Sequence, residues 1–320
     1  MRRDSDLLTG TLAALTAACL FGMLGPLARF GAEAGVGGIA FTAWRALLGV
    51  AFLLVLIAAR GGLRTARDAV VGLSGRGRAS LALAALMGLT LNASIFTAFG
   101  LIPIALALML FYTYPAGVVV VDLALGRERL TLGRVAALGL SSAGVALVLI
   151  GGSAPGEGPV NPLGIALGLA AAASQVVFVT VSRHGYTSVP ADAATTVILA
   201  TSVVGASTLA VVAGQADALA VPLGSLDPWM SLLLAGVAAA GLSSLLFLVA
   251  IRRIGGTRTG ILMLLEPVVG AVLAGLLLGE ALGPMQVVGG ALVLLGALVL
   301  QLRTGDGDEP IAVSATGPVV

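Results

Sequence analysis

The sequence predicts an all-α integral membrane protein in which ten transmembrane helices form two inverted five-helix repeats. Composition, run length and an internal repeat carry this prediction. Hydrophobic residues make up 58% of the 320 residues and charged residues only 10%, whereas a soluble domain has about 25% charged residues. The mean hydropathy is +1.10. Most of the protein surface must therefore face lipid.

The apolar residues come in runs of about 20, the length that a helix needs to cross the hydrocarbon core. In the strands of outer-membrane barrels apolar and polar residues alternate, and these runs show no such alternation. In the first half the expected spans are residues 8–28, 39–59, 79–100, 102–125 and 132–150. In the second half they are residues 162–182, 191–213, 229–251, 259–279 and 284–302.

A turn-rich stretch, GGSAPGEGPVNP at residues 151–162, separates the two halves. Glycine and proline punctuate connections in this way. We therefore expect a first repeat over residues 1–151 and a second over residues 152–302. Residues 303–320 lack any hydrophobic period, so they are expected to form a disordered cytoplasmic tail.

The two halves resemble each other at a shift of 152 residues. Four residues recur at this shift: Pro115 as Pro267, Glu128 as Glu280, Leu130 as Leu282 and Gly144 as Gly296. A proline, a glutamate and a glycine that keep register together are more than shared apolar composition. The sequence therefore predicts an internal duplication.

The duplication is predicted to be inverted, because five spans are an odd number. The arginines change place accordingly: Arg127 and Arg129 correspond to Gly279 and Ala281, and Gly100 and Leu101 correspond to Arg252 and Arg253. The glutamates keep their place in both halves. Each precedes an expected helix start, where the helix dipole favours a carboxylate and proline suits the first turn. A structural role is therefore expected for Glu128 and Glu280.

The arginines also predict the orientation in the membrane. The chain has no lysine, and its 17 basic residues are all arginine. With a cytoplasmic N-terminus, Arg29 alone lies on the outer side and Arg45 lies within the second span, while the other arginines face the cytoplasm. By the positive-inside rule, both termini are expected on the cytoplasmic side. The expected location is the inner or plasma membrane.

At the repeated blocks the chain resembles the EamA-type family of the drug/metabolite transporter superfamily. The most specific blocks are YPAGVVVVDLALGRERLTLGRVAALGLSSAGVALVL and EPVVGAVLAGLLLGEALGPMQVVGGALVLLGALVL. The resemblance implies a ten-helix carrier, commonly an exporter of amino acids or related metabolites. It also implies a cavity lined by spans 1, 3, 4, 6, 8 and 9, with spans 5 and 10 packing between copies or halves. The first span contains no acid, so the proton-for-cation exchange of the small multidrug members is not supported.

Ionisable residues within spans are candidates for function, because burying one in lipid costs roughly 2.5–3.5 kcal/mol on insertion scales. Glu266 lies about seven residues, or roughly 10 Å, into the ninth span, and its counterpart in the first half is Tyr114. It would bind a substrate ammonium group or take up a proton. Alternatively, the Glu-Pro pair holds a helix bend and the carboxylate is hydrogen-bonded locally.

Two other ionisable residues lie within the expected spans. Arg45 would hold a substrate carboxylate, which its planar guanidinium suits. Alternatively, its side chain reaches the interface or pairs with Glu33. Asp122 lies near the cytoplasmic end of the fourth span, where we expect it to pair with a loop arginine.

Uncharged polar residues on the spans complete the candidate set. Each of them, taken alone, equally suits a hydrogen bond between helices. The predicted substrate-binding residues are Glu266, Tyr112, Tyr114, Asn92, Gln175, Ser174, Ser243 and Arg45.

No catalytic, metal or cofactor site is expected. The single histidine, His184, falls in a loop, and no phosphate-binding loop occurs. The sequence therefore predicts a secondary-active or facilitative carrier that works by alternating access and exports small metabolites such as amino acids. Its expected partners are the bilayer and a small-molecule substrate, not nucleic acid. Its expected energy source is an ion gradient, with protons as one candidate, or the substrate's own gradient. Import, and a non-transporting scaffold or receptor, remain alternatives, and the oligomeric state stays open.

Overall fold

The computed structural model describes residues 2–124, 132–150, 160–182, 185–254, 259, 262–280 and 282–304. Within these ranges the regular secondary structure is entirely helical. The connector between the halves lies almost wholly outside them, as do Glu128, His184 and the tail from residue 305. The side chain of Asp122 is also outside the described part.

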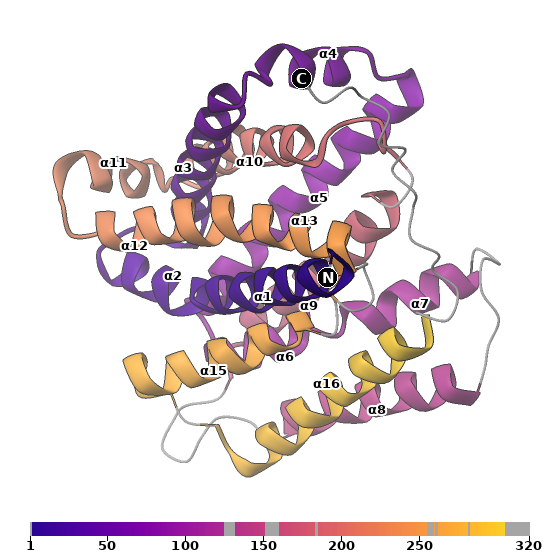
Figure 1. The fold of residues 1–320 in the computed structure, drawn as a ribbon. Helices are drawn as coiled ribbons and strands as arrows, with labels where there is room; N and C mark the ends of the chain where they lie inside the picture. The colour runs from indigo at the N-terminus through magenta and orange to yellow at the C-terminus, as the bar shows by residue number, and fades with distance from the viewer. Residues whose placement is uncertain are drawn as a thin grey trace.

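The first half contains eight described helices (Figure 1). They are α1 (Arg2–Gly22), α2 (Leu24–Glu33), α3 (Gly38–Ala59), α4 (Leu63–Val71), α5 (Gly75–Phe99), α6 (Ile104–Phe111), α7 (Tyr114–Ala124) and α8 (Leu132–Ile150). The second half begins with α9 (Pro162–Ser182), α10 (Ala191–Val212), α11 (Ala216–Gly224) and α12 (Trp229–Leu233). It continues with the π-helix η1 (Leu234–Leu242), α13 (Ser243–Ile254), α15 (Leu265–Leu278) and α16 (Pro284–Thr304).

Among the described residues, six helical segments are long and apolar enough to cross a membrane. They are Leu7–Glu33, Gly38–Ala59, Gly75–Phe99, Pro162–Ser182, Ala191–Val212 and Trp229–Phe247. Shorter apolar helices cover Ile104–Val118, Leu265–Leu278 and Pro284–Gly296. The chain is therefore a multi-pass helical membrane protein, and its long spans agree with six of the ten predicted ones to within a few residues at most ends.

Two short helices were not predicted. α4 follows α3, and α11 follows α10, so they occupy the same place in the two halves. Each follows a glycine with a left-handed backbone, Gly61 at φ 67° and Gly214 at φ 70°. Such a glycine is a common helix end. Both helices, of nine residues each, lie in the glycine-containing gaps between the predicted spans, where loops were expected.

The packing of the helices confirms the inverted repeat. α1 packs against α13, and α5 packs against α9; exchanging the halves turns one pair into the other. Three further pairs map onto themselves under the same exchange: α3 with α10, α6 with α15, and α8 with α16. The last pair lies together at one edge of the bundle (Figure 1). A two-fold relation between the halves therefore orders the described contacts.

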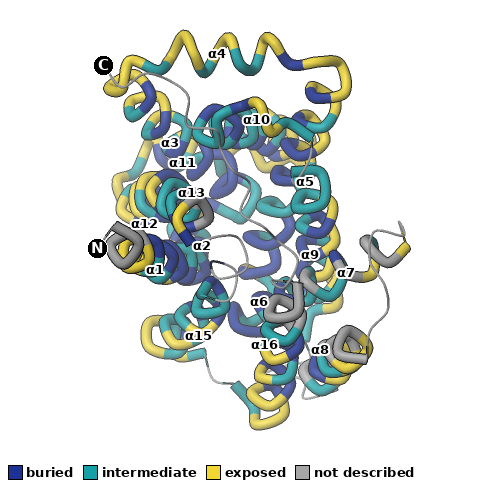
Figure 2. Tube along the Cα trace, turned by 45° about the vertical axis from the view of Figure 1, so that its right-hand side comes forward, coloured by how far each residue is buried: buried dark blue, intermediate teal, exposed yellow. Residues whose placement is uncertain are grey.

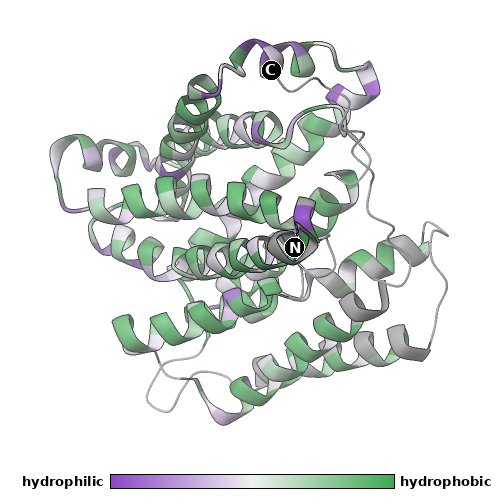
Figure 3. Ribbon diagram, viewed as in Figure 1, coloured by the Kyte–Doolittle hydropathy of each residue, from purple (hydrophilic) through white to green (hydrophobic). Residues whose placement is uncertain are grey.

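Small residues make up much of the interior, and apolar side chains also cover the outside. Many alanines are fully buried beside large residues such as Phe41 and Leu53, and other large apolar side chains on the long helices are exposed. Figure 2 shows the buried residues toward the centre of the bundle, and Figure 3 shows apolar residues on nearly all helix surfaces. Hydrophilic residues gather on α4 instead (Figure 3). Exposed apolar side chains and buried alanines suit a lipid environment, where close packing of small residues holds helices together.

One close contact, made against backbone atoms, joins α3 to α5 at Gly38. A Cβ atom at Gly38 would lie 2.5 Å from the backbone nitrogen of Thr97 and 2.6 Å from the carbonyl oxygen of Phe96. Backbone atoms cannot move aside as the tip of a side chain can. Gly38 therefore sets the distance between these two helices.

We expect Gly38→Ala to lower the free energy of unfolding by about 1–3 kcal/mol, the usual cost of overpacking. Gly37→Ala is the matched control, because a Cβ there would meet no atom within 4 Å. The midpoint of thermal unfolding in detergent measures both variants. Equal midpoints for the two would contradict the assigned role of Gly38.

Candidate functional site

Two membrane helices are interrupted at equivalent places in the two halves. α6 ends at Phe111 and α7 begins at Tyr114, while α15 begins at Leu265 after a turn at Leu264. Each break lies just before a repeated proline. Proline has no amide hydrogen, so the carbonyl group four residues earlier loses its helical partner. Pro267 thereby leaves the carbonyl of Met263 without one.

Tyr112 supplies that missing partner from the other half of the protein. Its hydroxyl oxygen lies 3.1 Å from the carbonyl oxygen of Met263 and 3.0 Å from Oε2 of Glu266. The Tyr112 side chain is buried and Glu266 is half-buried. The ring of Tyr114 lies 5.9 Å from that of Tyr112. The structure thus brings together three predicted site residues, Glu266, Tyr112 and Tyr114.

The Tyr112 hydroxyl has a single proton and two acceptors. When Glu266 is ionised, the proton is drawn to the carboxylate and the Met263 carbonyl loses its donor. When Glu266 is protonated, the carboxyl group donates to Tyr112 and Tyr112 donates to Met263. The protonation of Glu266 therefore decides whether the carbonyl at the break is hydrogen-bonded.

Arg45 and Asn92 form a second cluster between α3 and α5. The Arg45 side chain is only 4% exposed. One of its NH2 nitrogens donates to Oδ1 of Asn92 at 2.5 Å, and the guanidinium carbon lies 4.9 Å from the centre of the Phe96 ring. Asn92 in turn donates from Nδ2 to the Gly88 carbonyl at 2.7 Å. The amide is thereby oriented with its oxygen toward the guanidinium.

Neither structural alternative considered for Arg45 is observed. The side chain is buried rather than extended to the interface, and within the described ranges no ion pair joins it to Glu33. Its Nε atom is buried without a hydrogen-bond partner. The π-helix η1 packs against the backbone of α3 at Arg45. A Cβ atom at Gly236 of η1 would lie 3.1 Å from the Arg45 carbonyl oxygen. The result is a buried cation with hydrogen-bonding capacity to spare, next to a helix type that is frequent at functional sites.

Both clusters lie in a chain that matches a known protein family over nearly its whole length. The EamA-like transporter family matches residues 8–150 and 162–302, one match for each half. The chain belongs to the EamA-like transporter family. It is therefore a membrane transporter of small molecules, and the family consists of transporters rather than enzymes.

Solved structures support the fold of this EamA-like transporter. A protein of known crystal structure is similar at 21% identity with a TM-score of 0.59, covering 92% of this chain and 98% of its own. At that identity the likeness concerns the fold alone. No curated protein matches the chain.

The remaining predicted site residues join neither cluster through a described hydrogen bond. Ser174 is buried and Gln175 half-buried, both on α9. The Ser243 hydroxyl donates to the carbonyl of Ala239, one turn earlier in its own helical segment. This local bond is the structural alternative for Ser243, and it leaves the hydroxyl proton already used.

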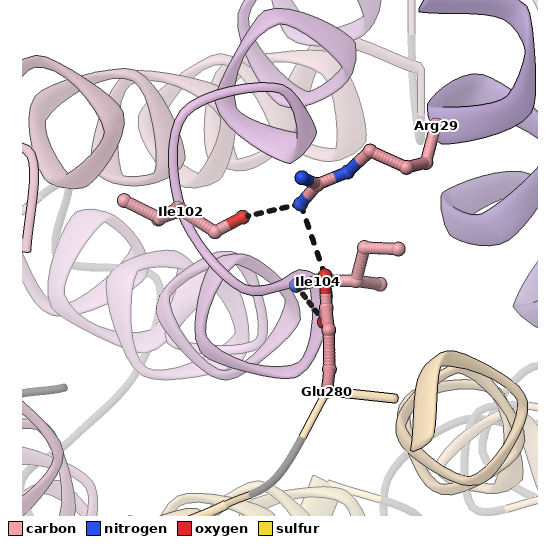
Figure 4. Close-up of polar contacts among 4 residues, drawn as sticks. All are labelled: Arg29, Ile102, Ile104 and Glu280. Atoms are coloured by element: carbon pink, nitrogen blue, oxygen red, sulfur yellow. Dashed lines mark hydrogen bonds and ion pairs between the residues drawn. The ribbon is translucent and has the colours of Figure 1, made fainter. Parts of the chain in front are cut away.

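The sequence analysis missed a polar junction at the other end of α15. Glu280 accepts from an NH2 nitrogen of Arg29 at 3.0 Å and from the backbone nitrogen of Ile104 at 2.7 Å (Figure 4). These contacts agree with a structural role for Glu280, and they add the N-terminus of α6 as a place where its carboxylate acts. Nothing in the local sequence signals a partner 251 residues away.

We expect Tyr112→Phe to lower the free energy of unfolding by about 1–3 kcal/mol, because the buried pair of acceptors, the Met263 carbonyl and the Glu266 carboxylate, loses the hydroxyl proton that either of them can accept. Tyr114→Phe is the control: its ring packs against Tyr112, but no hydrogen bond of its hydroxyl is described. Thermal unfolding in detergent compares the two. A larger loss for Tyr114→Phe would contradict the assigned contacts.

Proposed function

We propose that this EamA-like transporter is a secondary carrier that exports small metabolites such as amino acids by alternating access. Ten spans cross the inner or plasma membrane as two inverted five-span units, residues 1–151 and 152–302. Both termini are cytoplasmic. The protein needs no cofactor or metal.

The observation that carries this proposal is the pair of helix breaks. Secondary transporters with inverted repeats bind substrate near the midplane, where interrupted helices expose backbone groups. Here the breaks occur at equivalent positions, one just before Tyr114 and one just before Glu266. Tyr112 and Glu266 connect them by a hydrogen bond of 3.0 Å. A phenol and a carboxylate from opposite halves thus meet where such carriers bind substrate.

Several features support ten spans. The remaining four spans are proposed to be α6 with α7, α8, α15 and α16. α8 has 19 residues and α16 has 21, lengths that suffice to cross. A broken span can cross because its loose backbone groups are satisfied by neighbouring protein rather than by lipid. α1 begins and α16 ends on the same side of the bundle (Figure 1), which agrees with termini in one compartment. The distribution of arginines assigns that compartment to the cytoplasm.

The two clusters offer complementary charges to a substrate. Glu266 is proposed to bind an ammonium group or a proton, with Tyr112 and Tyr114 beside it. Arg45, oriented by Asn92, is proposed to bind a carboxylate in a conformation that exposes it. Gln175, Ser174 and Ser243 remain proposed contacts from α9 and the eighth span.

Proton coupling follows from the chemistry of Tyr112. Protonation of Glu266 satisfies the Met263 carbonyl through the Tyr112 hydroxyl, and ionisation withdraws that bond. A substrate ammonium group at Glu266 would favour the ionised form. Substrate and proton would then compete for one carboxylate, which is how an exchanger avoids carrying both at once.

Counterflow in proteoliposomes tests the transport proposal directly. Vesicles loaded with one solute of a panel of amino acids, sugars and cationic drugs are exposed to the same labelled solute, with and without a pH gradient. Accumulation of an amino acid would support the proposal. Absence of accumulation for the whole panel would favour a scaffold or receptor, and uptake in cells rather than loss would favour an importer.

We expect Glu266→Gln to abolish the response of counterflow to a pH gradient, because the amide cannot exchange a proton. Glu33→Gln is the matched control, since Glu33 is exposed at the end of α2. A mutant that keeps both transport and its pH response would remove Glu266 from the proposed site.

Membrane topology has a separate test. Alkaline phosphatase, which is active only outside the cytoplasm, is fused after residue 304 and, in a second fusion, after Asp227 in the connection between α11 and α12. We expect activity only from the second fusion. Activity from the C-terminal fusion would overturn the ten-span orientation.

A further inference from the structure

The polar junction at the end of α15 joins the two halves of the protein. Arg29 on α2 belongs to the first half, and Glu280 belongs to the second. The Arg29 nitrogen that donates to Glu280 also lies 3.3 Å from the carbonyl oxygen of Ile102. Figure 4 shows the guanidinium between that carbonyl and the Glu280 carboxylate. α2, the start of α6 and the end of α15 are therefore held at one point.

Each oxygen of the Glu280 carboxylate has its own described partner. Oε1 accepts from Arg29, and Oε2 accepts from the backbone nitrogen of Ile104. Ile104 is the first residue of α6, where the amide has no partner within the helix. The carboxylate also faces the positive end of the α6 dipole. Pulling α15 away from α6 would break both charge-assisted hydrogen bonds together.

A close-packed seam runs from this junction toward the Glu266 site. A Cβ at Gly270 of α15 would lie 2.5 Å from Cδ1 of Leu108 on α6 and 3.5 Å from the carbonyl oxygen of Gly22 on α1. A Cβ at Gly22 would lie 2.9 Å from the Glu266 carbonyl oxygen. These contacts leave no room between α15 and the first half in the stretch from Gly270 to Glu266.

A cavity of about 270 Å³ opens on the far side of the junction. It is lined by Arg29, Phe30, Glu33, Leu277, Leu278 and Glu280. Its α15 lining lies at Leu277 and Leu278, eleven or twelve residues beyond Glu266, or about 16–18 Å along a helix. The Arg29 and Glu280 side chains are 28% and 14% exposed. Both members of the junction therefore line this cavity, at the end of α15 remote from Glu266.

We propose that the Arg29–Glu280 pair and the Ile104 amide form a lock that keeps the outer end of the seam closed. Release of the lock lets α15 leave α6, so that the Leu108–Gly270 contact opens and the cavity becomes continuous with the Glu266 site. The lock rests on the proposed function in that its opening would be one half of alternating access. Its test, however, measures exposure and does not require transport.

The experiment measures how fast a maleimide reagent reaches a cysteine in the seam. Leu108→Cys is introduced into a Cys19→Ser background, because Cys19 is the single native cysteine. Leu108 is 5% exposed, so slow labelling is expected while the lock is closed. Asp227→Cys, at an exposed position between α11 and α12, reports the general reactivity of the same sample in nanodiscs.

We expect Arg29→Ala and Glu280→Gln each to raise the labelling rate of Leu108→Cys about tenfold, a change of about 1.4 kcal/mol in the opening equilibrium. The Asp227→Cys rate should not change. Glu33→Gln is the matched control, because it removes a carboxylate from the same cavity without touching the lock. It should leave the rate of Leu108→Cys unchanged.

A charge-reversal experiment distinguishes a lock from a contact that only stabilises the fold. Arg29→Glu alone should speed labelling, and adding Glu280→Arg should slow it again, because a guanidinium and a carboxylate once more face each other. Unchanged labelling in the single variants, an equal effect of Glu33→Gln, or no reversal in the double variant would each overturn the lock. Where a variant does not fold, Arg29→Lys replaces Arg29→Ala, and it should speed labelling less than Glu280→Gln does.

The outcomes for the lock and for the carrier proposal are distinct. Faster labelling without counterflow of any solute would keep the lock and reject the transport proposal. Counterflow with unchanged labelling would keep transport and reject the lock.

Discussion

Inside a bilayer every backbone carbonyl needs a partner from the protein, because no water is present to supply one. Pro267 removes the helical partner of the Met263 carbonyl, and Tyr112 from the other half replaces it at 3.1 Å. The same hydroxyl reaches Glu266. A single hydrogen-bonding requirement thus breaks a membrane helix, ties the two halves together and places a carboxylate at the break.

The inverted repeat explains why the break in α15 has a counterpart between α6 and α7. The helix packing is alike in the two halves, because the α1–α13 contact corresponds to the α5–α9 contact. The side chains at the two breaks differ: the first half has Tyr114 at the position where the second half has Glu266. A symmetric scaffold gives two conformations of similar energy, and an asymmetric site allows a proton or a charged substrate to favour one of them.

Two polar contacts between the halves lie at different depths of this scaffold. The Tyr112–Glu266 bond lies beside the breaks, and the Arg29–Glu280 pair lies where α15 ends. Between them Gly270 faces the Leu108 side chain and Gly22 faces the Val269 side chain, so the helices pack closely. Separating the halves must break these packing contacts together with the polar bonds, whose strength depends on charge and on the surrounding medium.

The sequence by itself determined the membrane class, the helical spans and the inverted repeat, because run length, composition and the displaced arginines are properties of the chain that lipid and topology constrain directly. It also singled out Glu266, Tyr112, Arg45 and Asn92, since polar groups in apolar spans are costly. Only the tertiary structure decided which of these meet. Tyr112 forms a hydrogen bond with Glu266, 154 residues later in the chain, and Glu280 accepts one from the first backbone amide of α6. Hydrogen bonds are made by atoms close in space, and residues this far apart in the chain become neighbours only when the halves fold together.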